Sequence, residues 1–202
     1  CFCYVVLIVL LPLRLIGVEG LSPLHSGFIM LALSAPMLVV PLLAGWLTRW
    51  LSANTLCAFG FLIAAVGLYA LASCATGDHQ QLILALLVIG SGTGLPWGLM
   101  DGLAVSIVPK EQAGMAAGIF STTRVAGEGV VLAITFALLT ALVGDSLAGT
   151  HLYSRAEELA QRVVMGDLGY VEVFDLQTLQ LAYQDGFDAL LMMLIGFTVM
   201  SA

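Results

Sequence analysis

Long apolar runs are the feature of this sequence that most restricts its fold. The run from about residue 26 to 47 carries no charged side chain, and about 20 mostly apolar residues are enough for a helix to cross a bilayer. Only 9% of the 202 residues are charged, whereas a soluble domain averages about 25%. Because the chain has too few polar side chains to cover itself with a polar surface, we expect lipid to be its solvent.

Six segments have the composition of membrane-spanning helices. They cover approximately residues 1–16, 26–47, 53–75, 82–108, 114–143 and 186–202. In hydrocarbon, every backbone polar group must be satisfied within the segment, which favours helices. We therefore predict an all-α, polytopic transmembrane helix bundle in which residues 144–185 form a long extracytoplasmic loop. Because the first and last segments are interrupted by the ends of the sequence, we expect this chain to be part of a longer protein.

Charge and motif content exclude several classes of function. The formal net charge is -7, and the six basic residues are scattered, so the chain lacks the clustered cations that a nucleic acid requires. No Cys/His metal spacing, phosphate-binding loop or nucleophile motif is present. We therefore expect no nucleic-acid partner, no metal, no cofactor and no enzymatic activity.

Two basic residues indicate an orientation in the membrane. Arg49 and Lys110 lie in alternate short connections, while Glu19 and Asp78 lie in the opposite ones. The positive-inside rule places the first pair on the cytoplasmic side. We therefore expect a multi-pass protein of the cell (inner) membrane.

Glycines form a regular stripe on the fourth segment. Gly90, Gly94, Gly98 and Gly102 recur every fourth residue, and Pro96 lies among them. Small residues at this spacing let helices approach closely in lipid, and an internal proline is expected to kink the helix. Two further helix-packing positions, one turn apart at the start of the fifth segment, are Gly114 and Gly118. The stripe fits either ordinary tight packing or a helix that must bend or slide against its neighbour.

Three charged residues lie within the apolar segments. A charge at the bilayer centre costs at least about 2.5–3.5 kcal/mol, so such residues normally face a partner or a water-filled cavity. Arg124 and Glu128 are one helical turn apart and can pair, and Asp101 lies at a comparable depth on the preceding segment. We predict a polar cluster on the substrate or proton pathway, with these candidate members: Asp101, Arg124, Glu128, Trp97, Thr93 and Ser121. The alternative is a structural latch in which the charges neutralise one another.

Residues 11–50 resemble the fourteen-helix drug:proton antiporters of the major facilitator superfamily, the EmrB/QacA-type transporters. The matching features are Pro12, the turn of Gly20–Gly27 with its Ser22-Pro23 pair, and a cytoplasmic loop motif of Gly45 and Arg49. The loop motif departs from the family pattern, because the expected Asp, the later Gly and the basic pair are absent.

Residues 90–134 carry the second part of the resemblance. They are similar to the glycine-rich helix, the "V-P" turn and the "R-x-x-G" helix of that family. The matching positions are Gly90, Gly92, Gly94, Pro109, Gly114, Ala116, Gly118, Arg124 and Gly127. Glu128 is a departure, since a small residue is usual there.

The resemblance implies a proton-coupled exporter of amphipathic compounds that works by rocking two helix bundles against each other. This chain would be the C-terminal half, and the missing N-terminal half would carry the usual proton-coupling acids. The implied partners are therefore the bilayer, a small amphipathic substrate, protons and that N-terminal half. Three alternatives stay open: an exporter of another small solute, a non-transporting membrane assembly protein, and an intramembrane enzyme that uses Asp101 or Glu128.

Overall fold

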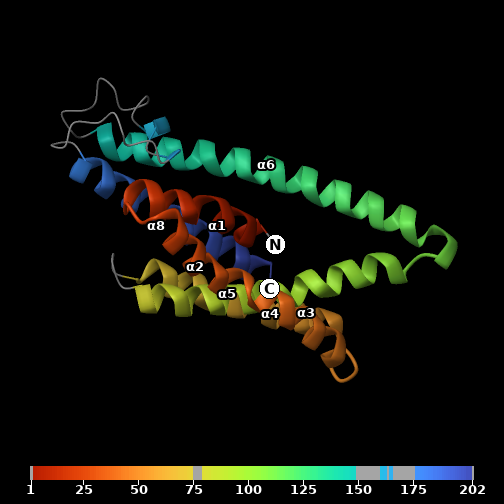
Figure 1. The fold of residues 1–202 in the computed structure, drawn as a ribbon. Coiled ribbons are helices and arrows are strands. Elements are labelled where there is room, and N and C mark those ends of the chain that lie inside the picture. The colour runs from red at the N-terminus through yellow and green to blue at the C-terminus, as the bar shows by residue number, and fades with distance from the viewer. Residues whose placement is uncertain (1, 75–78, 149–159, 163, 166–175, 202) are drawn as a thin grey trace.

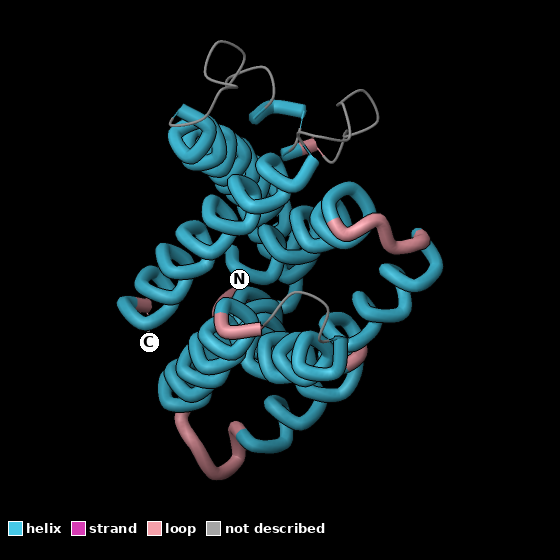
Figure 2. The backbone as a smooth tube through the Cα atoms, turned by 90° about the vertical axis from the view of Figure 1, so that its left-hand side faces the viewer, coloured by secondary structure: helices cyan, strands magenta, loops and turns pink. Residues whose placement is uncertain are grey.

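The computed structural model describes residues 2–74, 79–148, 160–162, 164–165 and 176–201. In this part of the chain all regular elements are helices, and none is a strand (Figure 2). The α-helices are α1 (Phe2–Leu13), α2 (Pro23–Ser34), α3 (Pro36–Leu47), α4 (Ala53–Ala72), α5 (His79–Ser106), α6 (Ala113–Ala148) and α8 (Leu176–Met200). A π-helix, η1 (Arg14–Val18), continues α1, and a 3-10 helix, η2 (Lys110–Gln112), precedes α6. The predicted all-α fold is confirmed.

Within the described residues, four helical stretches are long and apolar enough to cross a membrane. They are Pro23–Leu47, Ala53–Ala72, His79–Ser106 and Lys110–Leu147, and Phe2–Gly17 is a shorter apolar helix. The first stretch joins α2 and α3 across Ala35. The break falls there because Pro36 has no N–H to donate to the preceding turn.

The helices extend beyond the apolar runs from which they were predicted. Helix α6 continues to Ala148 and α8 begins at Leu176, so helices cover both ends of the region predicted as a loop, residues 144–185. Residues 149–159, 163 and 166–175 of that predicted loop lie outside the described part of the chain. The prediction stopped at polar residues, but a helix continues where polar side chains can reach the membrane surface. The early turns of α8 also belong to the core, since Tyr183 and Phe187 are fully buried.

The helices pack around α1 and α8 (Figure 1). Helix α6 runs along one side of the molecule, and α4 and α5 lie on the other side, with α1 and α8 between them. Helix α8 packs against both α4 and α6, while α1 contacts α6, α2 and α5. Helices α5 and α6 meet at the corner formed by η2, which brings Asp101 and Arg124 within reach of each other.

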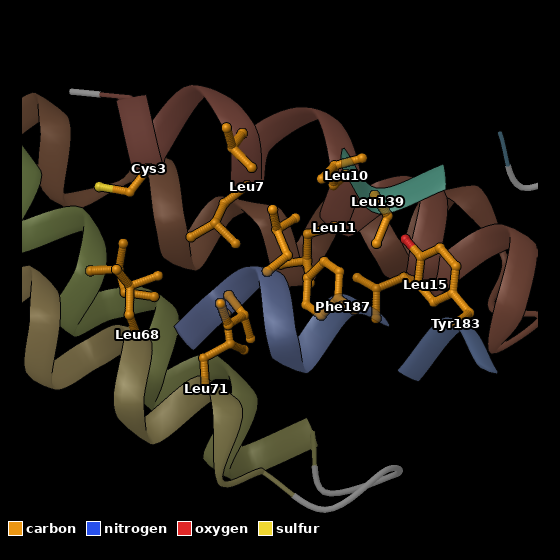
Figure 3. Packing of buried hydrophobic residues seen from close by; sticks show 14 of the residues in the cluster. Cys3, Leu7, Leu10, Leu11, Leu15, Leu68, Leu71, Leu139, Tyr183 and Phe187 are labelled. Carbon is orange, nitrogen blue, oxygen red and sulfur yellow. The ribbon is translucent and has the colours of Figure 1, made fainter. Parts of the chain in front are cut away.

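One hydrophobic cluster joins α1 to α6 and α8 and extends to α2, α4 and α5 (Figure 3). Leu7, Leu11 and Leu15 follow one face of the first helix at helical spacing and are almost completely buried. They pack in one cluster with Leu139 of α6 and Phe187 of α8. This cluster holds together segments from both ends of the chain.

Helix α5 is packed closely on two sides through its glycines. A Cβ on Gly92 would collide with the backbone of α4, at the Ala64 nitrogen and the Gly60 oxygen. On another face, a Cβ on Gly98 would come within 2.6 Å of Pro41 Cβ of α3, and one on Gly90 would collide with the Leu33 carbonyl. Such close approach is possible only where a side chain is absent.

Three of the other predicted packing glycines have open surroundings, and Gly94 does not. At Gly102, Gly114 and Gly118 an added Cβ would meet no atom within 4 Å, whereas one on Gly94 would come within 3.1 Å of Val40. Pro96 lies inside α5 without interrupting it. The close packing therefore covers the first part of α5 and ends before its junction with α6.

The continuous α2–α3 stretch presents a large apolar surface. Leu24, Leu38 and Leu42 are each more than 70% exposed. A surface of this kind is unstable in water and requires lipid or other helices against it. The exposed side chains thus agree with a membrane environment.

We predict that Gly92→Ala destabilises the fold by about 1–3 kcal/mol, because the added methyl group overpacks the α4–α5 contact. Gly102→Ala is the matched control on the same helix. Its methyl group enters open space and should stabilise the helix slightly through its higher propensity. Denaturant titration of the complete natural protein in mild detergent measures both changes. Equal stability of the two variants would contradict the packing described for Gly92.

Candidate functional site

Arg124 is the centre of a polar cluster between α5 and α6. Its Nη1 donates a 2.7 Å hydrogen bond to Asp101 Oδ1. Its Nε lies 3.8 Å from Glu128 Oε1, one turn further along the same helix. The structure therefore brings the three predicted charged residues together, with Arg124 shared between two carboxylates.

Aromatic rings surround the guanidinium group of Arg124. Its Cζ lies 5.1 Å from the ring centre of Trp97 and 5.6 Å from that of Phe120. Trp97 in turn meets Tyr4 of α1 edge to face, at 5.5 Å between centroids. Cation–π contacts of this kind gain strength where water is excluded. The guanidinium group thus lies against rings of α5 and α6, and the Trp97 ring is itself in contact with α1.

The pairing of Arg124 with Glu128 leaves hydrogen-bonding capacity unused. Arg124 Nε and Glu128 Oε1 are both buried atoms, and neither has a hydrogen-bond partner. The distance between them is too long for a good hydrogen bond. One positive and two negative groups give the cluster a formal net charge of −1. The cluster thus contains one buried donor and one buried acceptor without a hydrogen bond.

These two residues are among those that line an apolar cavity of about 520 Å³. Its walls come from five helices, α1, α4, α5, α6 and α8, and are mainly aromatic and aliphatic. The lining residues are Phe2, Cys3, Phe61, Met100, Phe120, Thr123, Arg124, Gly127, Glu128, Leu194, Phe197, Thr198 and Ser201. The volume lies within the range of about 300–1,000 Å³ that is typical of small-molecule sites.

Four of the six predicted site residues do not line the cavity: Thr93, Trp97, Asp101 and Ser121. Trp97 and Asp101 reach it only through their contacts with Arg124. Thr93 is buried, and its hydroxyl donates to the carbonyl oxygen of Ile89 at 2.9 Å. Ser121 is exposed on α6, and neither residue lines the cavity. In the predicted cytoplasmic loop motif, Gly45 lies near the end of α3, and Arg49 is exposed in the following turn.

Sequence reasoning missed most of the cavity wall. Phe120 could have been predicted as a neighbour of Arg124, because it lies one turn earlier on the same face of the helix. Phe61, Leu194 and Phe197 lie on other helices, α4 and α8. The sequences of these two helices do not indicate that they pack beside Arg124. The cavity arises from the packing of separate helices and not from a motif.

A second buried ion pair was also missed, at the end of α1. Arg14 Nε lies 3.1 Å from Glu19 Oε1, and both side chains are at least 85% buried. The π-helical turn η1 brings this pair together, and the Glu19 N–H donates to the Arg14 oxygen at 3.0 Å. π-helical turns occur frequently at functional sites. Gly20 then reverses the chain with a φ of 68°.

The second pair lies against α8. Arg14 Cζ is 5.0 Å from the ring centre of Phe187, which stacks on Tyr183 at 5.9 Å. The Tyr183 hydroxyl is buried and has no hydrogen-bond partner. Since Arg14 and Glu19 neutralise each other, this arrangement holds α1 to α8 without leaving a buried charge.

We predict that Arg14→Gln lowers the free energy of unfolding by roughly 2–5 kcal/mol, because the Glu19 carboxylate is then buried without its cation. The double variant Arg14→Gln/Glu19→Gln should recover part of this loss. The difference between the single and double variants gives the interaction energy, measured by denaturant titration in mild detergent. Additive losses would show that the two side chains do not stabilise each other.

Comparison with known proteins shows the family. The family model described as Major Facilitator Superfamily matches residues 1–132. The chain is 28% identical over 152 residues to the "Multidrug resistance protein Stp" of Mycobacterium tuberculosis, covering 75% of this chain and 28% of that protein. It is 31% identical over 153 residues to the "Uncharacterized transporter YebQ" of Escherichia coli, covering 75% of this chain and 33% of that protein.

A further relative is the "Drug efflux pump JefA" of Mycobacterium tuberculosis, with 29% identity over 153 residues, covering 74% of this chain and 29% of that protein. The alignments thus span a third or less of the length of these relatives. No solved structure matches the chain. The family match covers well over half of the residues, and the apolar helices agree with it, so this chain belongs to the major facilitator superfamily of membrane transporters.

Proposed function

We propose that this chain is the C-terminal half of a fourteen-helix drug:proton antiporter of the cell (inner) membrane, which exports small amphipathic compounds against inward proton flow. The observation that carries the proposal is the Arg124 cluster at the edge of an aromatic-walled cavity. The names of two relatives, a multidrug resistance protein and a drug efflux pump, support it.

The cavity has the composition that an amphipathic substrate requires. Apolar walls bind a substrate by removing its hydrophobic surface from water. The buried Glu128 Oε1 and Arg124 Nε can then hydrogen-bond to a polar group of the substrate. Because the cluster carries a formal net charge of −1, it favours compounds with one positive charge.

The proposed helix arrangement extends over the whole chain. Residues 1–202 form the C-terminal transmembrane portion, with the connections of Arg49 and Lys110 in the cytoplasm and the connection between α6 and α8 outside it. The N-terminal half of the same transporter is the partner that closes the transport pathway, and the bilayer covers the outer surface. The exposed apolar face of α2–α3 supports this arrangement.

We predict that Asp101→Asn with Glu128→Gln lowers the efflux of a lipophilic cation such as ethidium by about tenfold, as expected for a loss of roughly 1.4 kcal/mol of binding free energy. Efflux is measured in energised cells that express the complete natural protein, and protein abundance in the membrane is measured in parallel. Glu111→Gln is the matched control, because Glu111 is an exposed carboxylate outside the cavity. Wild-type rates and wild-type proton dependence at normal abundance would refute the proposed pathway.

A single variant separates a pathway role from a structural latch. We expect Arg124→Gln to accumulate as folded protein with altered export, because the glycine contacts that hold α5 against α2, α3 and α4 do not involve Arg124 and its partner Asp101 is about half exposed. Loss of the folded protein would instead assign Arg124 to a latch. If export never depends on a proton gradient and a stable partner co-purifies in mild detergent, the protein is a membrane assembly protein.

A further inference from the structure

We propose that His25 and His79 form a site for one divalent transition-metal ion of the Zn²⁺, Ni²⁺ or Cu²⁺ type, at the adjacent N-terminal ends of α2 and α5. His25 lies in the first turn of α2, and His79 is the first residue of α5. Their ring centroids are 5.9 Å apart, and the ring planes are tilted by 52°. The two residues are far apart in the sequence and match no metal-binding motif. They come together only because α2 and α5 pack against each other.

The separation of the rings suits one bridging ion. A Zn–N bond of about 2.0–2.1 Å places the metal about 3.2 Å from the centroid of each imidazole ring. Two rings on one ion then have centroids about 5.2 Å apart at a tetrahedral angle and about 6.4 Å apart in a linear arrangement. The observed 5.9 Å lies between these limits. The tilt also shows that the rings are not stacked face to face, so small side-chain rotations can direct one nitrogen of each toward a shared ion.

The ligand type selects the class of metal. Neutral imidazole suits Zn²⁺, Ni²⁺ and Cu²⁺, whereas Mg²⁺ and Ca²⁺ prefer oxygen ligands. The neutral form of imidazole is the form that binds metal. The described residues contain no group of three or more potential ligands, so water would complete the coordination of the ion. A site of this kind is open and exchangeable.

The helices hold the two histidines in place before any ion arrives. Ser22 Oγ accepts a hydrogen bond from the His25 N–H at 3.3 Å and caps α2 at its first turn. Helices α2 and α5 pack against each other, with the glycine contact of Gly90 at Leu33 between them. His25 is exposed and His79 is half-buried, so an ion from solution can reach both. A bound ion would therefore join the ends of two helices that already lie together.

The test uses the complete natural protein, purified in mild detergent without metal. Isothermal titration with Zn²⁺ and Ni²⁺ should give one ion per chain, and a saturating ion should raise the Tm by roughly 3–10 °C. The variants His25→Gln and His79→Gln should each abolish the binding and the rise in Tm. The matched control is His151→Gln, which removes the remaining one of the three histidines and should leave both intact. Mg²⁺ should have no effect.

Retention of the full Tm rise by either His25→Gln or His79→Gln would overturn the proposal. A second measurement avoids dependence on the folding of the variants. In the wild-type protein, bound Zn²⁺ should slow the modification of His25 and His79 by diethyl pyrocarbonate at least fivefold, read by peptide mass. Equal modification rates with and without Zn²⁺ would also overturn it. Neither readout involves transport, so failure of this proposal and failure of the proposed export are distinguishable.

Discussion

The close packing of α5 between α4 and the α2–α3 stretch is the contact on which the other features depend. In lipid, helices gain nothing from hiding apolar side chains from one another, so association requires close van der Waals contact. Gly92 provides it against α4, and Gly90 and Gly98 provide it against α2 and α3. Beyond Gly98 the packing opens, and there α5 carries Asp101 toward Arg124. Helix α5 is therefore closely packed as far as Gly98 and loosely packed at Gly102.

The two ion pairs solve the problem of a buried charge in different ways. Arg14 and Glu19 lie on one turn of chain, balance each other and are almost fully covered. Arg124 has two carboxylate partners on two helices, and the Asp101 side chain is about half exposed. The first arrangement is closed and neutral, which suits a structural role. The second retains a net charge and unused hydrogen-bonding atoms beside a cavity, which suits the binding of a ligand.

The sequence could predict features that lie within one helix or across one short turn. Arg124 and Glu128 follow from helical spacing, and Asp101 follows from the short connection between its helix and theirs. The Arg14 pair could not be predicted, because it is the π-helical turn η1 that brings Glu19, the residue directly after the turn, back to Arg14. The cavity wall and the meeting of His25 with His79 depend on how separate helices pack. Apolar periodicity determines which segments are helices, but not which of them become neighbours.

The length of α6 has a consequence for how the molecule sits in a bilayer. Its 36 residues extend over about 54 Å at 1.5 Å per residue, whereas the hydrocarbon core is only about 30 Å thick. Even at a tilt of about 40°, the upper end of the observed range, the helix rises about 41 Å along the membrane normal. Several turns must therefore stand among the headgroups or in water. The last turns of α6 contain Val143 and Leu147, which belong to the hydrophobic core. Where these turns extend past the hydrocarbon, the surrounding helices, and not lipid, keep this part of the core away from water.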